Sequence, residues 1–148
     1  MPRQKKFDCT VFVFDVNSCD GFKERAVKCY LELCALKIYT GKDDMCKLIL
    51  INTNETKNFM AGKGGYQNIV EATEIGEYNL EHRVHIDSAV PAHGNWLEGL
   101  NVGVQKLVEL SSQSSVSSLQ LVMFSDFKTT LSTDDVESSK LVEKVITG

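Results

Sequence analysis

The sequence predicts an α/β fold, in which an open, mostly parallel sheet carries helices on both faces. Short apolar runs at residues 9–16, 47–52 and 119–126 have the length and the Val, Ile and Phe content of strands buried on both faces. Between them lie longer segments, at about 21–39 and 95–110, where apolar residues recur at helical spacing. Strands and helices that alternate in this way are typical of a parallel sheet covered on both sides.

The first half of the chain supplies one strand, one helix and a second strand. Residues 9–16, "CTVFVFDV", form a nearly continuous apolar run that reaches Asp15. The helical period then begins near Gly21, with Lys and Glu between the apolar positions, and we expect Gly41 to end the helix. Residues 47–52, "KLILIN", predict the second buried strand, and a polar loop containing "GKGG" follows it.

In the second half of the chain, segments that clearly predict a helix or a strand alternate with segments that predict one only weakly. Residues 66–75, "YQNIVEATEI", predict a third strand with partial alternation, whereas 76–94 predict irregular chain. A helix at 95–110 is followed by "SSQSSVSS", residues 111–118, which predicts a surface loop. The strand at 119–126 ends in an aspartate, and a last helix is predicted from near Thr133, with Asp134 and Asp135 in its first turn.

These elements predict a single domain over residues 1–148 with a Rossmann-like arrangement. A chain of 148 residues can bury a sizeable core without a metal or disulfide staple. The sequence predicts four strands, while doubly wound sheets usually have more. We therefore expect the domain to be truncated at its C-terminal end.

Composition narrows the classes of function. The formal net charge is −4, and no run of Lys or Arg follows the N-terminal "RQKK", which argues against a domain that grips DNA by itself. No apolar segment approaches the length of a membrane span. The number of cysteines is five, which is odd, and none forms a C-x-x-C pair, so reduced and mostly buried thiols are expected.

Two of the predicted strands end in aspartates, Asp15 and Asp126. In parallel sheets ligands bind at the carboxyl ends of the strands. The pattern Asp-x-Ser-x-Ser would place hard oxygens around Mg²⁺, but this chain has Asn17 and Cys19 at the serine positions, and sulfur is a poor ligand for that ion. Asp15 could instead accept backbone N–H groups where the next helix begins. We favour this second interpretation and predict a vestigial site of Asp15, Asn17 and Asp126 that holds no metal.

Other motifs carry little chemistry. "GKGG" lacks the Ser or Thr and the following helix of a phosphate loop. His82 and His85 stand three apart without further ligands at zinc spacing, so we expect exposed loop histidines. No Cys/His or Ser/His/Asp arrangement is evident, and no catalytic residue or cofactor is predicted. Trp96 could belong to the core or line an apolar pocket.

Three segments resemble the loop-bearing segments of a von Willebrand factor A domain. They are "VFVFDVNSC", "NWLEGLNVGVQ" and "LVMFSD". That family binds its metal with Asp-x-Ser-x-Ser, a Thr and an Asp, and this chain departs from the pattern at Asn17, Cys19 and Asn95. A resemblance to one particular member of this family accounts for the loss of these metal ligands. "MAGKGGYQNIVEA" is similar to the N-terminal domain of the larger subunit of the Ku heterodimer, most specifically at residues 65–69.

This resemblance implies a non-catalytic interaction module. It implies that the chain pairs with the smaller Ku subunit in the nucleus and recruits repair factors in non-homologous end joining of DNA double-strand breaks and in telomere maintenance. DNA ends would be contacted only through the rest of the Ku subunit, and no membrane is involved.

The resemblance also implies a pocket for short peptides in which basic residues precede apolar ones. Matched by motif, the pocket residues are Met60, Tyr66, Asn95, Glu98 and Asn101. Two alternatives remain open. One is a metal-dependent von Willebrand A adhesion domain, and the other is a small α/β nucleotide-binding enzyme domain.

Overall fold

A computed structural model describes residues 6–40 and 43–128 of the chain. Its strands are β1 (Phe7–Asp15), β2 (Met45–Ile51), β3 (Ile69–Glu71), β4 (Gly76–Glu77) and β5 (Val116–Phe124). Its helices are α1 (Asp20–Thr40), α2 (Arg83–Ser88) and α3 (Trp96–Ser111), and two short 3₁₀ turns, η1 (Ala61–Lys63) and η2 (Leu80–His82), lie between them. None of the helices within the described ranges is long and apolar enough to cross a membrane.

The sheet is open and mixed, with its longest strands parallel. Its order is β3-β2-β1-β5, and β4 also pairs with β2. β1 lies parallel to both β2 and β5, so that Val13 is opposite Ile49 on one side and Met123 on the other. The short strands β3 and β4 are antiparallel to β2. The predicted α/β fold, with a mostly parallel Rossmann-like sheet, is confirmed.

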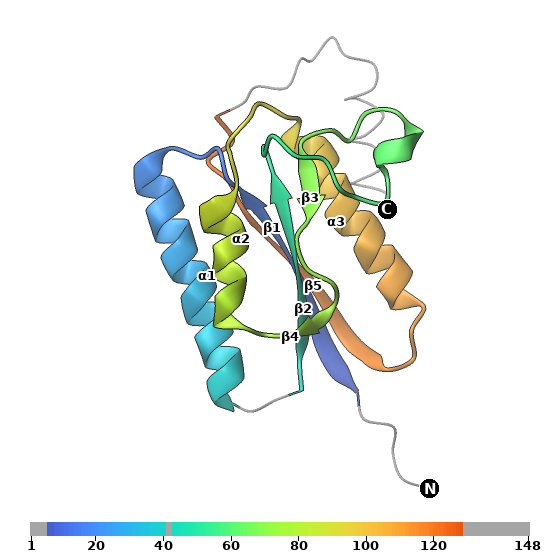
Figure 1. Cartoon of the computed structure of the whole chain (residues 1–148). Helices are drawn as coiled ribbons and strands as arrows, with labels where there is room; N and C mark the ends of the chain where they lie inside the picture. The colour runs from blue at the N-terminus through green and yellow to red at the C-terminus, as the bar shows by residue number, and fades with distance from the viewer. Residues whose placement is uncertain (1–5, 41–42, 129–148) are drawn as a thin grey trace, which may run out of the picture.

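Helices cover both faces of this sheet (Figure 1). On one face α1 and α2 pack over the strand residues Phe12, Phe14 and Leu48, with Tyr30 and Ile86 as their buried contacts. On the other face α3 packs over Val11, Val13, Ile49 and Ile51 and contributes Val102. Since both faces are covered, β1 is apolar at successive positions, which is the pattern that predicted it.

Glycines let α3 approach the sheet closely. A Cβ added at Gly99 would clash with the side chain of Ile51, and one added at Gly103 would lie 2.8 Å from Cδ1 of Leu121. The two glycines are four residues apart and therefore share one face of the helix. This contact fixes the position of the first turns of α3, which carry several of the predicted site residues.

The predicted third strand is much shorter than expected. Of residues 66–75 only Ile69–Glu71 are a strand. Tyr66 and Asn68 have positive φ angles of 57° and 64°, which an extended strand cannot contain. At the other end, the hydroxyl of Thr73 accepts the backbone N–H of Leu48 at 2.9 Å in place of regular ladder pairing.

Two further expectations are corrected. The segment 76–94, predicted to be irregular, contains β4, η2 and α2, and α2 is anchored by the fully buried Ile86. The serine-rich loop predicted at 111–118 is partly strand, because β5 begins at Val116. There the hydroxyls of Ser117 and Ser118 both donate to Asp8 on the neighbouring strand, at 2.7 and 2.6 Å. The helix predicted from Thr133 lies outside the described residues.

All five cysteines are free thiols. Cys9, Cys34 and Cys46 are buried, as their apolar segments predicted, while Cys19 and Cys29 are exposed. Burial raises the pKa of Cys46 to about 12. A thiol held protonated in this way is a poor nucleophile, so Cys46 serves as core packing.

Candidate functional site

Asp15 lies at the carboxyl end of β1 and is almost fully buried. One carboxylate oxygen accepts the backbone N–H of Asn17 at 2.9 Å, and the other accepts the hydroxyl of Ser125 at 2.7 Å. Both oxygens are therefore engaged within the protein. Asp15 acts as a turn residue. Its backbone donor is Asn17, which precedes the start of α1 at Asp20, so Asp15 does not accept the N–H groups at the helix start that the sequence predicted for it.

Asp126 lies beside the start of α1. Its Oδ2 accepts the backbone N–H of Cys19 at 2.8 Å, and its Oδ1 accepts that of Lys128 at 3.3 Å. Desolvation raises the pKa of this carboxyl, but the hydrogen bonds from Cys19 and Lys128 and the charge of Lys128 outweigh it and hold the pKa below its usual range. A carboxylate at this position also complements the positive end of the α1 dipole.

A lysine accompanies these two aspartates. The ammonium of Lys128 lies 3.4 Å from Oδ1 of Asn17, whose Nδ2 donates to the carbonyl of Ala92 at 2.9 Å. We call Asp15, Asn17, Cys19, Asp126 and Lys128 the strand-end cluster. The fold brings the predicted Asp15, Asn17 and Asp126 to one edge, together with a cation that the chain itself supplies. Sequence reasoning missed Lys128, although its place two residues after Asp126 was a usable signal.

A second cluster joins the glycine loop to α3. The backbone N–H of Tyr66 donates to Oε2 of Glu98 at 2.5 Å, and Nδ2 of Asn101 donates to the Tyr66 hydroxyl at 3.0 Å. Tyr66 is half-buried, whereas Asn101 has no exposed surface. Tyr66, which the resemblance selects from the glycine loop, therefore contacts both residues that it selects from α3, Glu98 and Asn101.

The conformation of Tyr66 is unusual. A bulky residue rarely adopts a φ of 57°, and such strain persists only where the surroundings impose it. Here the bond to Glu98 holds the backbone. The loop before it needs glycine, because Gly64 and Gly65 have φ angles of 81° and 74°, and a Cβ at Gly65 would lie 2.8 Å from Oε2 of Glu98.

Met60 and Asn95 complete what we call the loop–helix cluster: Met60, Tyr66, Asn95, Glu98 and Asn101. Met60 is only 6% exposed and packs in the same apolar cluster as Tyr66. Asn95 is the N-cap of α3, where its side-chain oxygen accepts the N–H groups of Leu97 and Glu98 at 2.9 and 3.3 Å. Tyr66, Asn95 and Glu98 are thus partly exposed members that a ligand can reach, while Met60 and Asn101 are buried behind them.

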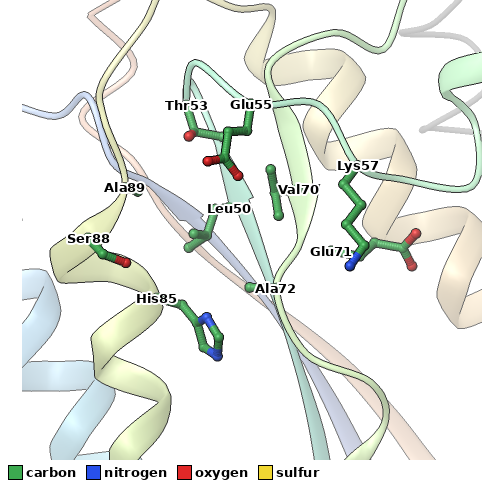
Figure 2. A pocket seen from close by; sticks show the side chains of 10 residues that line it. All are labelled: Leu50, Thr53, Glu55, Lys57, Val70, Glu71, Ala72, His85, Ser88 and Ala89. Atoms are coloured by element: carbon green, nitrogen blue, oxygen red, sulfur yellow. The ribbon is translucent and has the colours of Figure 1, made fainter.

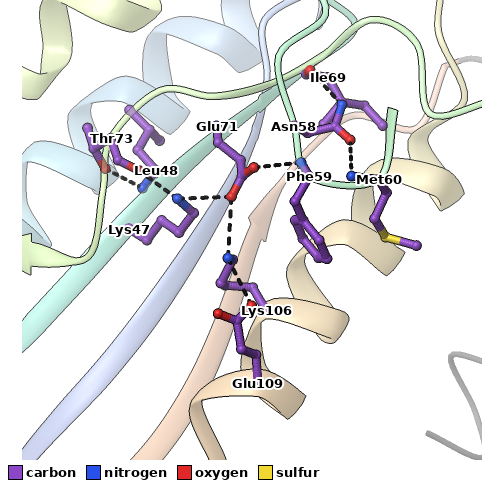
Figure 3. A network of polar contacts seen from close by, with 10 residues as sticks. All are labelled: Lys47, Leu48, Asn58, Phe59, Met60, Ile69, Glu71, Thr73, Lys106 and Glu109. Carbon is purple, nitrogen blue, oxygen red and sulfur yellow. Dashed lines mark hydrogen bonds and ion pairs between the residues drawn. The ribbon is translucent and has the colours of Figure 1, made fainter. Parts of the chain in front are cut away.

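An ion-pair network holds the loop that carries Met60 (Figure 3). Glu71 on β3 pairs with the buried ammonium of Lys47 at 3.1 Å and with Lys106 of α3 at 3.6 Å. Its other oxygen accepts the backbone N–H of Phe59 at 2.8 Å. The ammonium of Lys106 also lies 4.6 Å from the centre of the Phe59 ring. The residue before Met60 is therefore fixed to both β3 and α3.

His82 and His85 are not the exposed loop residues that the sequence predicted, whereas His93 is exposed and lies outside the helices and strands. His82 ends η2 and His85 lies in α2, and their rings are 6.2 Å apart. Nδ1 of His82 is buried and has no hydrogen-bond partner among the described residues. Desolvation and the neighbouring His85 lower the pKa of His82. Across residues 6–40 and 43–128, no group of three His, Cys, Asp or Glu side chains could hold a metal.

Trp96 is the first residue of α3 and follows the N-cap Asn95. It packs at the margin of the apolar core on the α3 face, and its ring meets that of Phe127 edge to face at 4.9 Å. It is partly buried, so it belongs to the margin of the core and keeps some exposed surface.

Comparisons with known proteins add no family assignment. No protein-family model matches the sequence. No curated protein matches it significantly either.

Proposed function

We propose that this chain is a non-catalytic interaction module of von Willebrand A type from the larger subunit of a Ku heterodimer. It would recruit repair factors through short linear motifs in non-homologous end joining of double-strand breaks and in telomere maintenance. The observation that carries the proposal is the direct contact of Tyr66 with both Glu98 and Asn101, the residues that the resemblance selects for peptide binding. The proposal includes a nuclear location and a smaller Ku subunit as partner.

The loop–helix cluster has the chemistry for a basic and apolar peptide. The half-buried Tyr66 ring offers an aromatic wall with a polar tip. Glu98 uses Oε2 for the Tyr66 N–H, while among the described residues its Oε1 has no hydrogen-bond partner and can accept from a Lys or Arg of the peptide. The Ku large subunit that the sequence resembles has an Asp at the position of Asn95, which is neutral here, so Glu98 carries the charge of this site. We expect an affinity on the order of micromolar, or about −8 kcal/mol.

The two alternatives find less support. A metal-dependent adhesion site needs carboxylate oxygens that are free, yet both oxygens of Asp15 are bound and an ammonium lies beside Asn17. A nucleotide-binding domain needs the start of the first helix for phosphate. In this chain the carboxylate of Asp126 already accepts the N–H of Cys19 at that position.

Fluorescence polarisation with a labelled peptide of basic residues followed by apolar ones tests the proposal. Tyr66→Ala and Met60→Ala should each weaken binding, because one removes the aromatic wall and the other the side chain that supports it. Tyr39→Ala is the matched control, since Tyr39 is 90% exposed at the far end of α1. Circular dichroism of each variant reports whether it is folded. If the folded Tyr66→Ala and Met60→Ala proteins bind as well as the parent, the pocket lies elsewhere.

A further inference from the structure

A hollow of about 240 Å³ opens between α2 and the sheet edge formed by β2 and β3 (Figure 2). Its floor is apolar and consists of Leu50, Val70 and Ala72. Leu50 belongs to the core on the α1 and α2 face, so the hollow lies on the opposite side of the sheet from α3. It is therefore separate from the loop–helix cluster.

The walls of this hollow carry polar side chains, among them one carboxylate. Figure 2 shows the carboxylate of Glu55 above Leu50 and the imidazole of His85 pointing inward from α2. Among the described residues, Glu55 has no hydrogen bond or ion pair. The hydroxyl of Ser88 donates to the carbonyl of Val84 at 2.7 Å, so only its lone pairs remain for a ligand.

Charged neighbours do not neutralise Glu55. Lys57 and Glu71 also line the hollow, but their charged ends lie on the other side of β3 in Figure 2 and point away from it. The carboxylate of Glu71 is already paired with Lys47 and Lys106. Glu55 is thus the charge that a ligand in the hollow would meet.

We propose that this hollow binds the side chain of an arginine from a partner protein. The aliphatic stem would lie on the apolar floor, while the guanidinium donates to Glu55 and Ser88 beside the His85 ring. A guanidinium carries five donors and no acceptor, which suits the Glu55 carboxylate and the lone pairs of Ser88, and its planar fork fits a carboxylate better than an ammonium does. The volume is below the roughly 300–1,000 Å³ of typical small-molecule sites, which favours one side chain over a larger ligand.

An NMR titration of the ¹⁵N-labelled 148-residue chain tests this site. The probes are N-acetyl-arginine N-methylamide and its citrulline counterpart, which has nearly the same shape but no charge. We expect saturable shifts from the arginine compound at residues 50–57, 70–72 and 85–89, and much smaller shifts from the citrulline compound. Equal shifts from both compounds, or arginine shifts centred elsewhere, would overturn the proposal.

Matched variants make the test specific. Glu55→Gln should weaken binding of the arginine compound by about fivefold, near the upper limit for a partly hydrated ion pair. Glu74→Gln removes a carboxylate that is also exposed but does not line the hollow, and this variant should bind the arginine compound as the parent does. Parent-like binding by Glu55→Gln would also overturn the proposal. Tyr66→Ala should keep the arginine shifts, so failure of this site is distinguishable from failure of the peptide site.

Discussion

The carboxylate of Glu98 accepts the backbone N–H of Tyr66 at 2.5 Å and thereby joins the first turn of α3 to a residue in the left-handed conformation. The same carboxylate lies against Gly65, where a side chain would collide with it. The shape of the glycine loop and the position of α3 are therefore coupled through one acidic side chain. A residue assigned to peptide binding also determines the structure of its own site.

Replacing Glu98 should accordingly cost stability. Glu98→Ala leaves the Tyr66 N–H without its acceptor while φ stays at a strained value, and we expect a loss of about 1–2 kcal/mol in the free energy of unfolding. Glu98→Gln keeps an acceptor oxygen and should lose less. Urea denaturation measures both, with Glu109→Ala, an exposed carboxylate on the same helix, as control. Equal stability of Glu98→Ala and Glu109→Ala would show that this bond contributes little.

The strand-end cluster should bind neither Mg²⁺ nor Mn²⁺. A metal would have to displace the hydrogen bonds that Asp15 and Asp126 already accept, and it would meet the ammonium of Lys128. Calorimetry at millimolar metal should give no heat above dilution. A saturable isotherm that disappears in Asp15→Ala would contradict this and favour the metal-dependent alternative.

Lys128 has its own measurable effect at the same cluster. The charge of Lys128 helps to lower the pKa of Asp126, so Lys128→Ala, which removes that charge but keeps the backbone N–H, should raise the pKa toward its ordinary value. An NMR titration of the Asp126 carboxyl measures the change. An unchanged pKa would mean that the hydrogen bonds from Cys19 and from the backbone N–H of residue 128 hold the carboxyl ionised without the lysine charge. Lys128→Arg, which keeps a cation, is the control.

Gly99 should tolerate no side chain. Gly99→Ala drives a methyl group into Ile51, and overpacking of this kind costs about 1–3 kcal/mol, more than the gain of about 1 kcal/mol that alanine brings to a helix. Gly21→Ala is the matched control, because no atom lies within 4 Å of the added Cβ in the first turn of α1. We expect this control to be neutral or slightly stabilising in thermal unfolding. If the two variants have the same melting temperature, α3 can move away from the sheet with little loss of stability, and the prediction is wrong.

The isolated chain should bind duplex DNA weakly or not at all. Its formal net charge is −4, and affinity for duplex DNA comes largely from Lys and Arg that neutralise phosphates. Fluorescence anisotropy with a short duplex at physiological salt should give no binding in the micromolar range. Sub-micromolar binding that weakens steeply with added salt would contradict the prediction.

Local patterns explain why most of the fold was predictable. The apolar run of β1 is continuous and short, which favours a buried strand. The apolar residues of α1 and α3 recur at helical spacing over longer segments, which favours helices. The six residues of α2 are too few to show a period, so only tertiary packing of Ile86 reveals the helix. Ser117 and Ser118 join a strand because Asp8 on β1 accepts both hydroxyls, a contact between residues 109 and 110 positions apart.

The candidate site was predictable as a set of residues but not as an arrangement. The resemblance selected Tyr66, Glu98 and Asn101 together, and the fold brings them into contact. It gave no sign that Asn101 is fully buried or that Tyr66 is left-handed, since both follow from the path of the glycine loop over α3. Compared with the Asp of the Ku large subunit, Asn95 lacks a negative charge. Its side chain nevertheless caps α3, a role that Asn performs as well as Asp.

His82 should make the protein less stable as the pH falls below neutrality. Desolvation and His85 lower its pKa in the folded state, so the unfolded chain takes up a proton first as the pH falls through its ordinary value of about 6.5. The stabilisation from neutral His82 is therefore complete above that pH and is lost below it. Urea midpoints at pH 7.5 and 5.5 should differ in the parent and differ less in His82→Leu, which cannot be protonated. His93→Gln, at an exposed position, is the control and should keep the parent's dependence. An unchanged pH dependence in His82→Leu would assign the effect to other groups.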